Sequence, residues 1–243
     1  MTTSDDIPPL PEDWQRALAV VAHPDDLEFG ASAAITRWVG QGRQVAELLV
    51  TRGEAGIDTI APQECGPLRT AEQLAAARVV GVEEVAFLDF PDGSLQYGLD
   101  LRRELARAIR RHRPEVLISL NFRETFPGSA AFNHADHRAL GPALLDAVRD
   151  AANRWMFPDL SDEGLRPWSG VRFAAFSGSP RATHHVPLSE GELAAGIASL
   201  AAHRAYLSAL GGFDHEAFLT AEARSAGESC GTGLATLFEV IPT

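Results

Sequence analysis

Short, mostly apolar runs alternate along the chain with longer segments whose apolar residues recur at helical spacing. The apolar runs predict strands at 17–22, 45–50, 85–88, 116–120, 171–176 and 234–241. The periodic segments predict helices at 27–41, 68–80, 100–112, 137–152 and 189–210. The last helix opens with Ser189 and Glu192, which have the spacing of a capping box. Because the first strands lack polar alternation, they should be buried on both faces, in a mostly parallel central sheet with helices on each side. The pattern therefore predicts an α/β fold, a three-layer sandwich.

The same pattern runs through the whole chain without an internal repeat or a low-complexity linker. We therefore expect a single domain over residues 1–243, with an irregular N-terminal extension at 1–14. Open parallel sheets bind ligands beyond the carboxyl ends of their strands, on the loops that follow them. The predicted loops with Gly and Pro are 51–67, 122–133 and 157–167.

The charge balance narrows the classes of partner. The formal net charge is -12, which repels the phosphate backbone of nucleic acids and anionic membrane surfaces. The N-terminus has neither the basic nor the apolar region of a signal peptide, and no apolar stretch approaches the roughly 18–20 residues of a membrane helix. We therefore expect a cytoplasmic protein with a small-molecule substrate and neither a nucleic acid nor a membrane as partner. A homo-oligomer is left open.

Two compositional features limit the possible chemistry. All 21 basic residues are Arg, and the absence of Lys excludes Schiff-base chemistry and phosphate-loop lysines. The two cysteines, Cys65 and Cys230, have no CxxC spacing. A disulfide framework and a cysteine-type structural zinc site are therefore not expected.

A first cluster of polar residues follows the first predicted strand directly. His23 and Asp26 are three residues apart, so they can converge on one point if a helix begins there. One imidazole and one carboxylate supply two of the three protein ligands of a catalytic zinc site. Asp25 would then lie within reach of the attacking water. Acids in the first turn of a helix are also favoured by the helix dipole, but that explanation leaves His23 unaccounted for.

A second cluster, His134-Ala135-Asp136-His137, follows the fourth predicted strand and its loop. A lone His-x-x-His is weak evidence, because histidines at a helix start are commonly solvated or structural. A parallel sheet can, however, bring this cluster beside the first one. One of these two histidines would then complete a site with three protein ligands and an open position, the pattern of catalytic zinc.

The two clusters resemble the ordered motifs of the PIG-L/LmbE-like deacetylases. Besides the clusters, the segments 51–56, 68–72 and 88–93 fit the family pattern, so the resemblance covers roughly residues 17–150. Many members have an acid directly after the second aspartate, whereas this chain has Leu27 there and an acid one place later, at Glu28. The resemblance implies a Rossmann-like fold, one zinc ion per chain and removal of an acetyl group from an N-acetylglucosaminyl moiety, or hydrolysis of a related amide.

The family motifs also imply roles for individual residues. The implied zinc ligands are His23, Asp26 and His137, and a His2Asp set also accepts other divalent first-row metals. Asp25 would be the general base. His134 would be an acid or, when protonated, a stabiliser of the oxyanion, with Asp136 orienting a histidine. Either Asp25 or His134 would protonate the leaving amine.

Four further residues are candidates for substrate binding: Arg52, Glu54, Arg69 and His184. The arginines could hold substrate hydroxyls, although long cations are usually just exposed, and a plain loop histidine is the simpler interpretation of His184. Asp92-Gly93 is interpreted as a turn.

The sequence thus predicts a zinc-dependent hydrolase of carbon–nitrogen bonds other than peptide bonds, acting on an N-acylated sugar conjugate. An amidase for a thiol conjugate or a natural-product tailoring substrate would use the same motifs. A non-catalytic sugar- or nucleotide-binding module is the alternative from another class. It predicts GxGxxG after the first strand, where this chain has HPDDLEFG.

Overall fold

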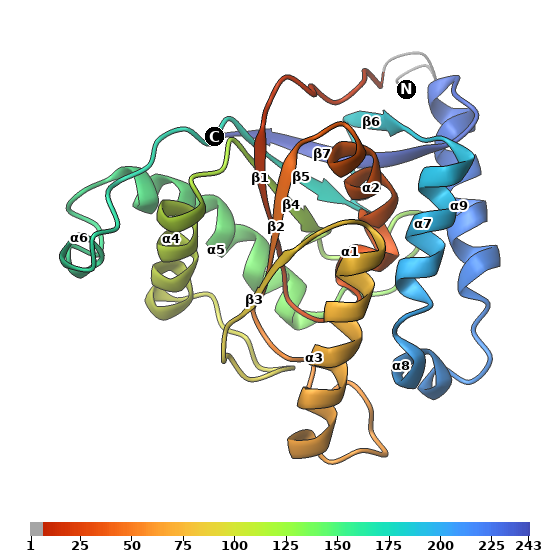
Figure 1. Cartoon of the computed structure of the whole chain (residues 1–243), viewed down its shortest axis with the longest axis horizontal. Helices are drawn as coiled ribbons and strands as arrows, with labels where there is room; N and C mark the ends of the chain where they lie inside the picture. Colours follow the sequence, from red (N-terminus) through yellow and green to blue (C-terminus); the bar gives the residue numbers. More distant parts are fainter. Residues whose placement is uncertain (1–6) are drawn as a thin grey trace.

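The computed structural model describes residues 7–243 and contains a seven-stranded sheet with the strand order β3-β2-β1-β4-β5-β7-β6 (Figure 1). The strands are β1 (Arg16–Val21), β2 (Gln44–Leu49), β3 (Glu84–Phe87), β4 (Val116–Leu120), β5 (Phe173–Ser177), β6 (His184–Pro187) and β7 (Ala235–Pro242). The first five are parallel, and β7 is antiparallel to both β5 and β6. The predicted mostly parallel sheet is confirmed.

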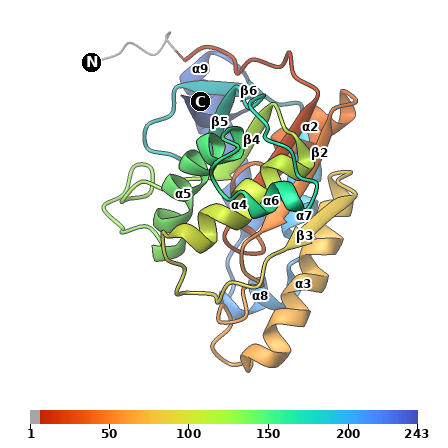
Figure 2. The ribbon, with the colours of Figure 1, turned by 90° about the vertical axis from the view of Figure 1, so that its left-hand side faces the viewer.

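Helices cover both faces of this sheet, as predicted. They are α1 (Asp26–Gly30), α2 (Ser32–Gly40), α3 (Pro62–Val79), α4 (Leu99–His112), α5 (Ala135–Ala152), α6 (Asp159–Asp162), α7 (Glu190–Leu200), α8 (Arg204–Ala209) and α9 (His215–Cys230). In Figure 2, α4 and α5 lie in front of the sheet, and Figure 1 shows α2 and α7 on the opposite side of the sheet from them. The α7 helix packs against α2 and α3, and α9 packs against α7 and β7.

The apolar residues of β1 divide between two cores, one on each face of the sheet. Leu18 and Val20 belong to the core beneath α4 and α5, whereas Ala19 and Val21 belong to the core beneath α1 and α2. This explains why the strand shows no polar alternation: both of its faces are buried. The carboxyl end of such a central strand is therefore held rigidly from both sides.

The structure corrects the predicted boundaries in several places. The predicted helix 27–41 is two helices, because Ala31 (φ -125°) leaves the helical conformation. The predicted helix 189–210 is likewise α7 and α8, although its capping box at Ser189 and Glu192 is confirmed. The α3 helix begins at Pro62, inside the predicted loop 51–67, with Pro in the first turn where no helical N–H partner is needed.

Three elements were absent from the prediction: α6, which lies inside the predicted loop 157–167, β6 and α9. The β6 strand is only four residues long, too short for a period to be recognised. The α9 helix has a polar and small-residue sequence, and it is fixed by its ends: Asp214 accepts from the Ala217 N–H, and Gly231 (φ 70°) terminates it.

Residues 1–6 of the predicted irregular extension 1–14 lie outside the described residues. From 7 to 14 the extension has one isolated bridge, between Pro9 and His185.

Cys65 and Cys230 are both free thiols. Within residues 7–243, no helix is both long and apolar enough to cross a membrane.

A glycine in α5 permits the close approach that sets this helix against the end of β4. A Cβ at Gly141 would overlap the Phe122 ring, which is itself packed edge-on against Phe176 at 4.6 Å. We therefore expect Gly141→Ala to lower the free energy of unfolding by about 1–3 kcal/mol, because the clash exceeds the gain in helix propensity. Gly40→Ala in α2 is the control, since a Cβ there meets nothing within 4 Å. Denaturant unfolding measures both variants, and equal midpoints for the two would contradict this account of the packing.

Candidate metal centre

The two polar clusters meet at the carboxyl ends of β1 and β4, which are neighbouring parallel strands. His23 lies in the turn between β1 and α1, and His134 and His137 lie at the start of α5. The ring centroids of His23 and His134 are 4.8 Å apart, and His137 Nε2 lies 3.0 Å from Asp26 Oδ1. The juxtaposition expected from the strand order is therefore present.

Asp26 lies between the two histidines predicted as metal ligands. Its Oδ2 accepts hydrogen bonds from the Ala22 and His23 N–H groups and lies 3.6 Å from His23 Nδ1. Burial raises the pKa of Asp26, but His137 and His23 outweigh it and hold that pKa well below its usual range. The carboxylate is thus ionised and fixed in place.

The other nitrogen of each histidine has a partner that sets its tautomer. His23 Nε2 lies 3.1 Å from Asp136 Oδ2 and 3.1 Å from Asp92 Oδ1. His137 Nδ1 lies 3.0 Å from Asn133 Oδ1, and the Asn133 amide nitrogen donates to two backbone carbonyls, so its oxygen faces the ring. His23 Nε2–H and His137 Nδ1–H are therefore donors. The opposite nitrogens face Asp26. Burial lowers the pKa of His23, but Asp26 and Asp136 outweigh it and raise that pKa well above its usual value, so a metal bound there would take the place of a proton.

The donor set formed by His23 Nδ1, Asp26 and His137 Nε2 fits a first-row divalent metal. Two ligand atoms at about 2.0–2.1 Å from a tetrahedral ion lie roughly 3.3 Å from each other. The observed separations are close to that value but involve the two different oxygens of Asp26: His23 Nδ1 lies 3.6 Å from Oδ2, and His137 Nε2 lies 3.0 Å from Oδ1. These donors are also what a hydrolytic zinc site uses. The assignment of the three residues as metal ligands stays a prediction.

Two groups of donor atoms lie within 4.8 Å of one another, and neither contains Asp26: His23 with His134 and His137, and His23 with Asp92 and Asp136. In the first group His134 Nδ1 accepts from the Asp136 N–H at 3.3 Å, so the ring proton resides on Nε2, which then donates rather than ligates. In the second, the two carboxylates share one histidine nitrogen and also accept backbone N–H groups. We therefore favour the set that contains Asp26.

Asp25 directly precedes the predicted ligand Asp26 and has a constrained backbone conformation. Its φ of 84° is left-handed, which is unusual for a residue other than Gly. Arg69 Nη2 donates to its Oδ2 at 2.9 Å. Burial raises the pKa of Asp25 to about 7, against the opposing effect of the Arg69 charge. A buried carboxyl group with such a pKa is suited to accept a proton near neutral pH.

Asp136 connects His23 to the loop after β3. Its carboxylate has no exposed surface, and it accepts from the Gly93 N–H at 2.8 Å and the Leu95 N–H at 3.0 Å. This geometry suits the predicted orienting role toward His23. Asp92 was interpreted as part of a turn, yet it lies against the same histidine. The family-like segment 88–93 was the sequence signal that could have identified it.

His134 differs from its expected protonation state. Burial, followed by the charges of His23 and His137, lowers its pKa. The ring is therefore neutral at pH 7, and Nε2–H of the neutral imidazole, rather than an imidazolium, is available to an oxyanion.

Comparison with known proteins agrees with this geometry. Residues 18–148, more than half of the chain, match the family model described as PIG-L: GlcNAc-PI de-N-acetylase. The chain belongs to the PIG-L family. The diacetylchitobiose deacetylase of Thermococcus kodakarensis is 30% identical over 138 residues, which cover 56% of this chain and 50% of that protein. The match thus spans about half the length of this curated relative.

Solved structures share the PIG-L fold over nearly the whole chain. N,N'-diacetylchitobiose deacetylase from Pyrococcus horikoshii has a TM-score of 0.84 at 22% identity, and the match covers 95% of this chain and 85% of that one. GalB, a 4-carboxy-2-hydroxymuconate hydratase from Pseudomonas putida, has a TM-score of 0.70 at 20% identity, with 93% and 96% covered. At these identities the likeness concerns the fold alone.

Two of the four residues predicted to bind substrate, Arg52 and Glu54, lie on the loop after β2. Both are within the PIG-L match, and both have exposed surface. The Arg52 side chain is 39% exposed, and it contacts Asp89 at 3.1 Å. Glu54 accepts from the Asp92 and Arg52 N–H groups and so ties two loops of the site together. Contact of these residues with substrate stays a prediction.

The structure places the other two predicted substrate residues elsewhere. Arg69 is 2% exposed, and its guanidinium is occupied by Asp25 and by the carbonyls of Pro24 and Gly53, so it supports Asp25 from within. His184 begins β6, four strands from β1 and thus roughly 19 Å away at about 4.8 Å per strand. Arg69 thus lies beside Asp25 and His184 lies far from it, and the assignment of both as substrate contacts stays a prediction.

Tyr206 of α8 was not anticipated in the site at all. The Arg69 guanidinium lies 4.3 Å from the centroid of its ring. Burial, and next the charge of Asp25, raise the pKa of Tyr206 to about 12, so its hydroxyl is protonated. Tyr206 lies outside the PIG-L match, in a part of the chain where no motif drew attention to it.

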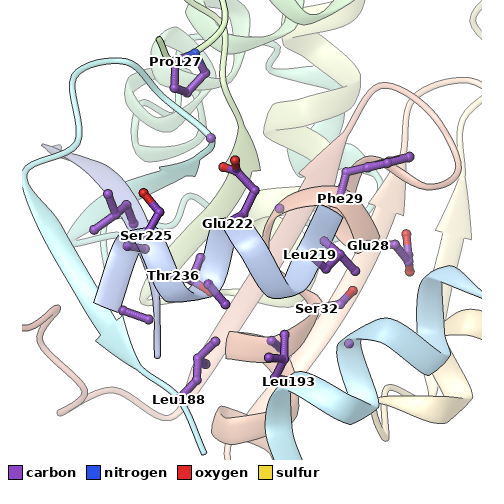
Figure 3. Close-up of a pocket in the computed structure, with 18 of the residues that line it drawn as sticks. Glu28, Phe29, Ser32, Pro127, Leu188, Leu193, Leu219, Glu222, Ser225 and Thr236 are labelled. Atoms are coloured by element: carbon purple, nitrogen blue, oxygen red, sulfur yellow. The ribbon is translucent and has the colours of Figure 1, made fainter. Parts of the chain in front are cut away.

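A pocket of about 440 Å³ lies apart from the metal centre (Figure 3). It is lined by the end of α1, by α7, α9 and β7, and by leucines that include Leu188, Leu193 and Leu219. Within residues 7–243, none of the predicted metal ligands lines it. It is therefore a separate feature, formed mostly outside the PIG-L match.

Proposed function

We propose that this chain is a metal-dependent amide hydrolase, and more narrowly a zinc-dependent deacetylase of an N-acetylglucosaminyl-type or other N-acylated sugar conjugate. The observation that carries the proposal is the position of Asp26 between His23 and His137, with the buried Asp25 directly beside it. Membership of the PIG-L family and the similarity to a diacetylchitobiose deacetylase support the same reaction. The bond cleaved is a carbon–nitrogen bond other than a peptide bond.

The ion would be held by His23 Nδ1, Asp26 and His137 Nε2. When bound, it acts as a Lewis acid on the amide carbonyl and on the attacking water. The Asp25 carboxylate accepts a proton from that water as it attacks. His134 donates its Nε2–H to the oxyanion of the tetrahedral intermediate. The proton held on Asp25 then passes to the nitrogen of the departing amine.

Asp92 and Asp136 orient His23 in this scheme, and Asn133 orients His137. A histidine held by a carboxylate keeps one tautomer and donates electron density more effectively to a metal. The pKa of the buried Asp25 is shifted toward neutrality, and it lies beside these donors. Such shifted groups cluster at catalytic sites, whereas a non-catalytic binding module does not need one.

The fold by itself does not determine the reaction, since a hydratase has the same architecture. The substrate is accordingly proposed from the metal-site residues and the relatives. A thiol conjugate or a natural-product amide could be hydrolysed by the same metal-site residues. The loops with Arg52 and Glu54 would discriminate among these substrates.

Metal analysis combined with a substrate panel tests the proposal. We expect about one divalent ion per chain and acetate release from N-acetylglucosamine, diacetylchitobiose or a related conjugate, lost on chelation and restored by Zn²⁺. Cleavage of larger amides without acetate release would replace the deacetylase by the amidase. Protein that binds no divalent ion, or hydrolyses substrate equally well after chelation, would contradict the metal-dependent reaction.

A further inference from the structure

Two carboxylates are buried where neither packing nor the proposed reaction requires them. Glu47 is 1% exposed and lies within β2, level with Ala19 of β1 and Val85 of β3. Glu28 of α1 is 2% exposed. Charged side chains are rarely buried in the interior of a parallel sheet unless a specific partner holds them. The two carboxylates therefore require a partner that explains their position.

The partner that the two carboxylates share is Gln73 of α3, which has no exposed surface. Glu28 also lies 3.6 Å from His203 Nε2 and accepts from Ser199 Oγ. The Gln73 amide donates through Nε2 to Glu28 Oε1 and to Glu47 Oε2, each at 3.1 Å. Its Oε1 accepts from the Asp25 N–H at 3.0 Å. One side-chain amide thus connects both carboxylates to the backbone of the proposed general base.

The carboxylates fix which way this amide points. If the amide turned over, its oxygen would face Glu28 and Glu47, and its NH2 group would face the Asp25 N–H. Burial, and next the Glu28 charge, raise the pKa of Glu47 to about 8, so Glu47 is mostly protonated at neutral pH. The pair can therefore remain buried around the shared amide without two full charges.

Asp25 needs such support because its left-handed backbone is strained. Residues other than Gly keep a conformation of this kind only where the surroundings hold them in it. Arg69 holds the carboxylate and the preceding carbonyl, of Pro24. The backbone N–H of Asp25 is held by Gln73. The two α3 residues therefore act on different parts of the same turn.

We propose that Gln73 is a positioning residue for Asp25, with its amide orientation set by the buried pair Glu28 and Glu47. The pair and Gln73 fix the backbone of Asp25, and thereby the direction in which its carboxylate meets the attacking water. The catalytic consequence rests on the proposed function, whereas the hydrogen bond to the Asp25 N–H does not.

The test is Gln73→Met, which keeps the length of the side chain and removes its hydrogen bonds. We expect kcat to fall about 10- to 100-fold with KM within about twofold and metal content unchanged, as for misplacement of a catalytic group. Gln63→Met, at an exposed position of the same helix, is the matched control with wild-type kcat. Glu47→Gln keeps an acceptor for the Gln73 amide and should retain most activity. If Gln73→Met does not fold, Gln73→Asn withdraws the same amide and should show the same fall in kcat.

Amide hydrogen exchange at Asp25 supplies a readout independent of activity. Exchange of the Asp25 N–H should accelerate at least about tenfold in Gln73→Met and remain as in the wild type in Gln63→Met. Wild-type kcat in Gln73→Met, or unchanged Asp25 exchange, would overturn the inference. If the wild type hydrolyses no amide, the proposed function fails, and faster Asp25 exchange in Gln73→Met would still support the positioning contact.

Discussion

His137→Ala is expected to lose the bound metal and to reduce amide hydrolysis about 10³-fold or more. The reason is that His137 Nε2 faces Asp26 Oδ1 at 3.0 Å and supplies the third donor of the predicted site. Loss of Lewis-acid stabilisation worth several kcal/mol corresponds to at least that change in rate. Metal content by elemental analysis and kcat/KM on the same preparations measure the effect.

His134→Ala is the matched control, because its ring belongs to the same cluster but carries its proton on Nε2. We expect this variant to keep stoichiometric metal while its kcat falls, since only the donor to the oxyanion is removed. Metal lost from His134→Ala and kept in His137→Ala would exchange the two roles, whereas metal lost from both variants would support the three-histidine group instead.

Asp25→Asn is expected to retain metal and fold but to lower kcat by about 10²- to 10⁴-fold, the range for removal of a general base. The side-chain amide oxygen of this variant can still accept from Arg69, so the turn after β1 keeps its main side-chain contact. What the variant loses is a group able to accept a proton. Single-turnover kinetics with the best substrate of the panel would measure this change.

The companion change Asp58→Asn, in a neighbouring exposed stretch, controls for loss of a negative charge and should leave kcat unaltered. Full activity in metal-loaded Asp25→Asn would remove Asp25 from the role of base. His134 would then be the remaining candidate for proton transfer among the residues at the centre.

The central strands and their helices followed from the sequence because burial on both faces leaves an unmistakable apolar run. In β1, for example, Leu18 and Ala19 enter different cores, and both are fully buried. Elements whose stability comes from tertiary contacts were harder to predict. The α9 helix is held by its caps and by packing on α7 and β7, and no apolar stripe marks it in the sequence.

The residues of the candidate metal centre likewise fall into those that the sequence predicted and those that it did not. Its proposed ligands lie in two short motifs, so their residue types and the strand order were sufficient to place them together. Gln73, Asn133 and Tyr206 act by contacts across the fold, with ordinary residue types at unremarkable positions. Arg69 was found by its motif, but the sequence did not show that it is buried and that it contacts Asp25. The cytoplasmic location and the single-domain organisation stay predictions.

The most direct test of the central claim is the metal stoichiometry and acetate release of the wild type, His137→Ala and Asp25→Asn, measured side by side. The account predicts about one ion per chain in the wild type and Asp25→Asn, none in His137→Ala, and rapid acetate release by the wild type alone. Acetate release at the wild-type rate by metal-free His137→Ala would contradict it.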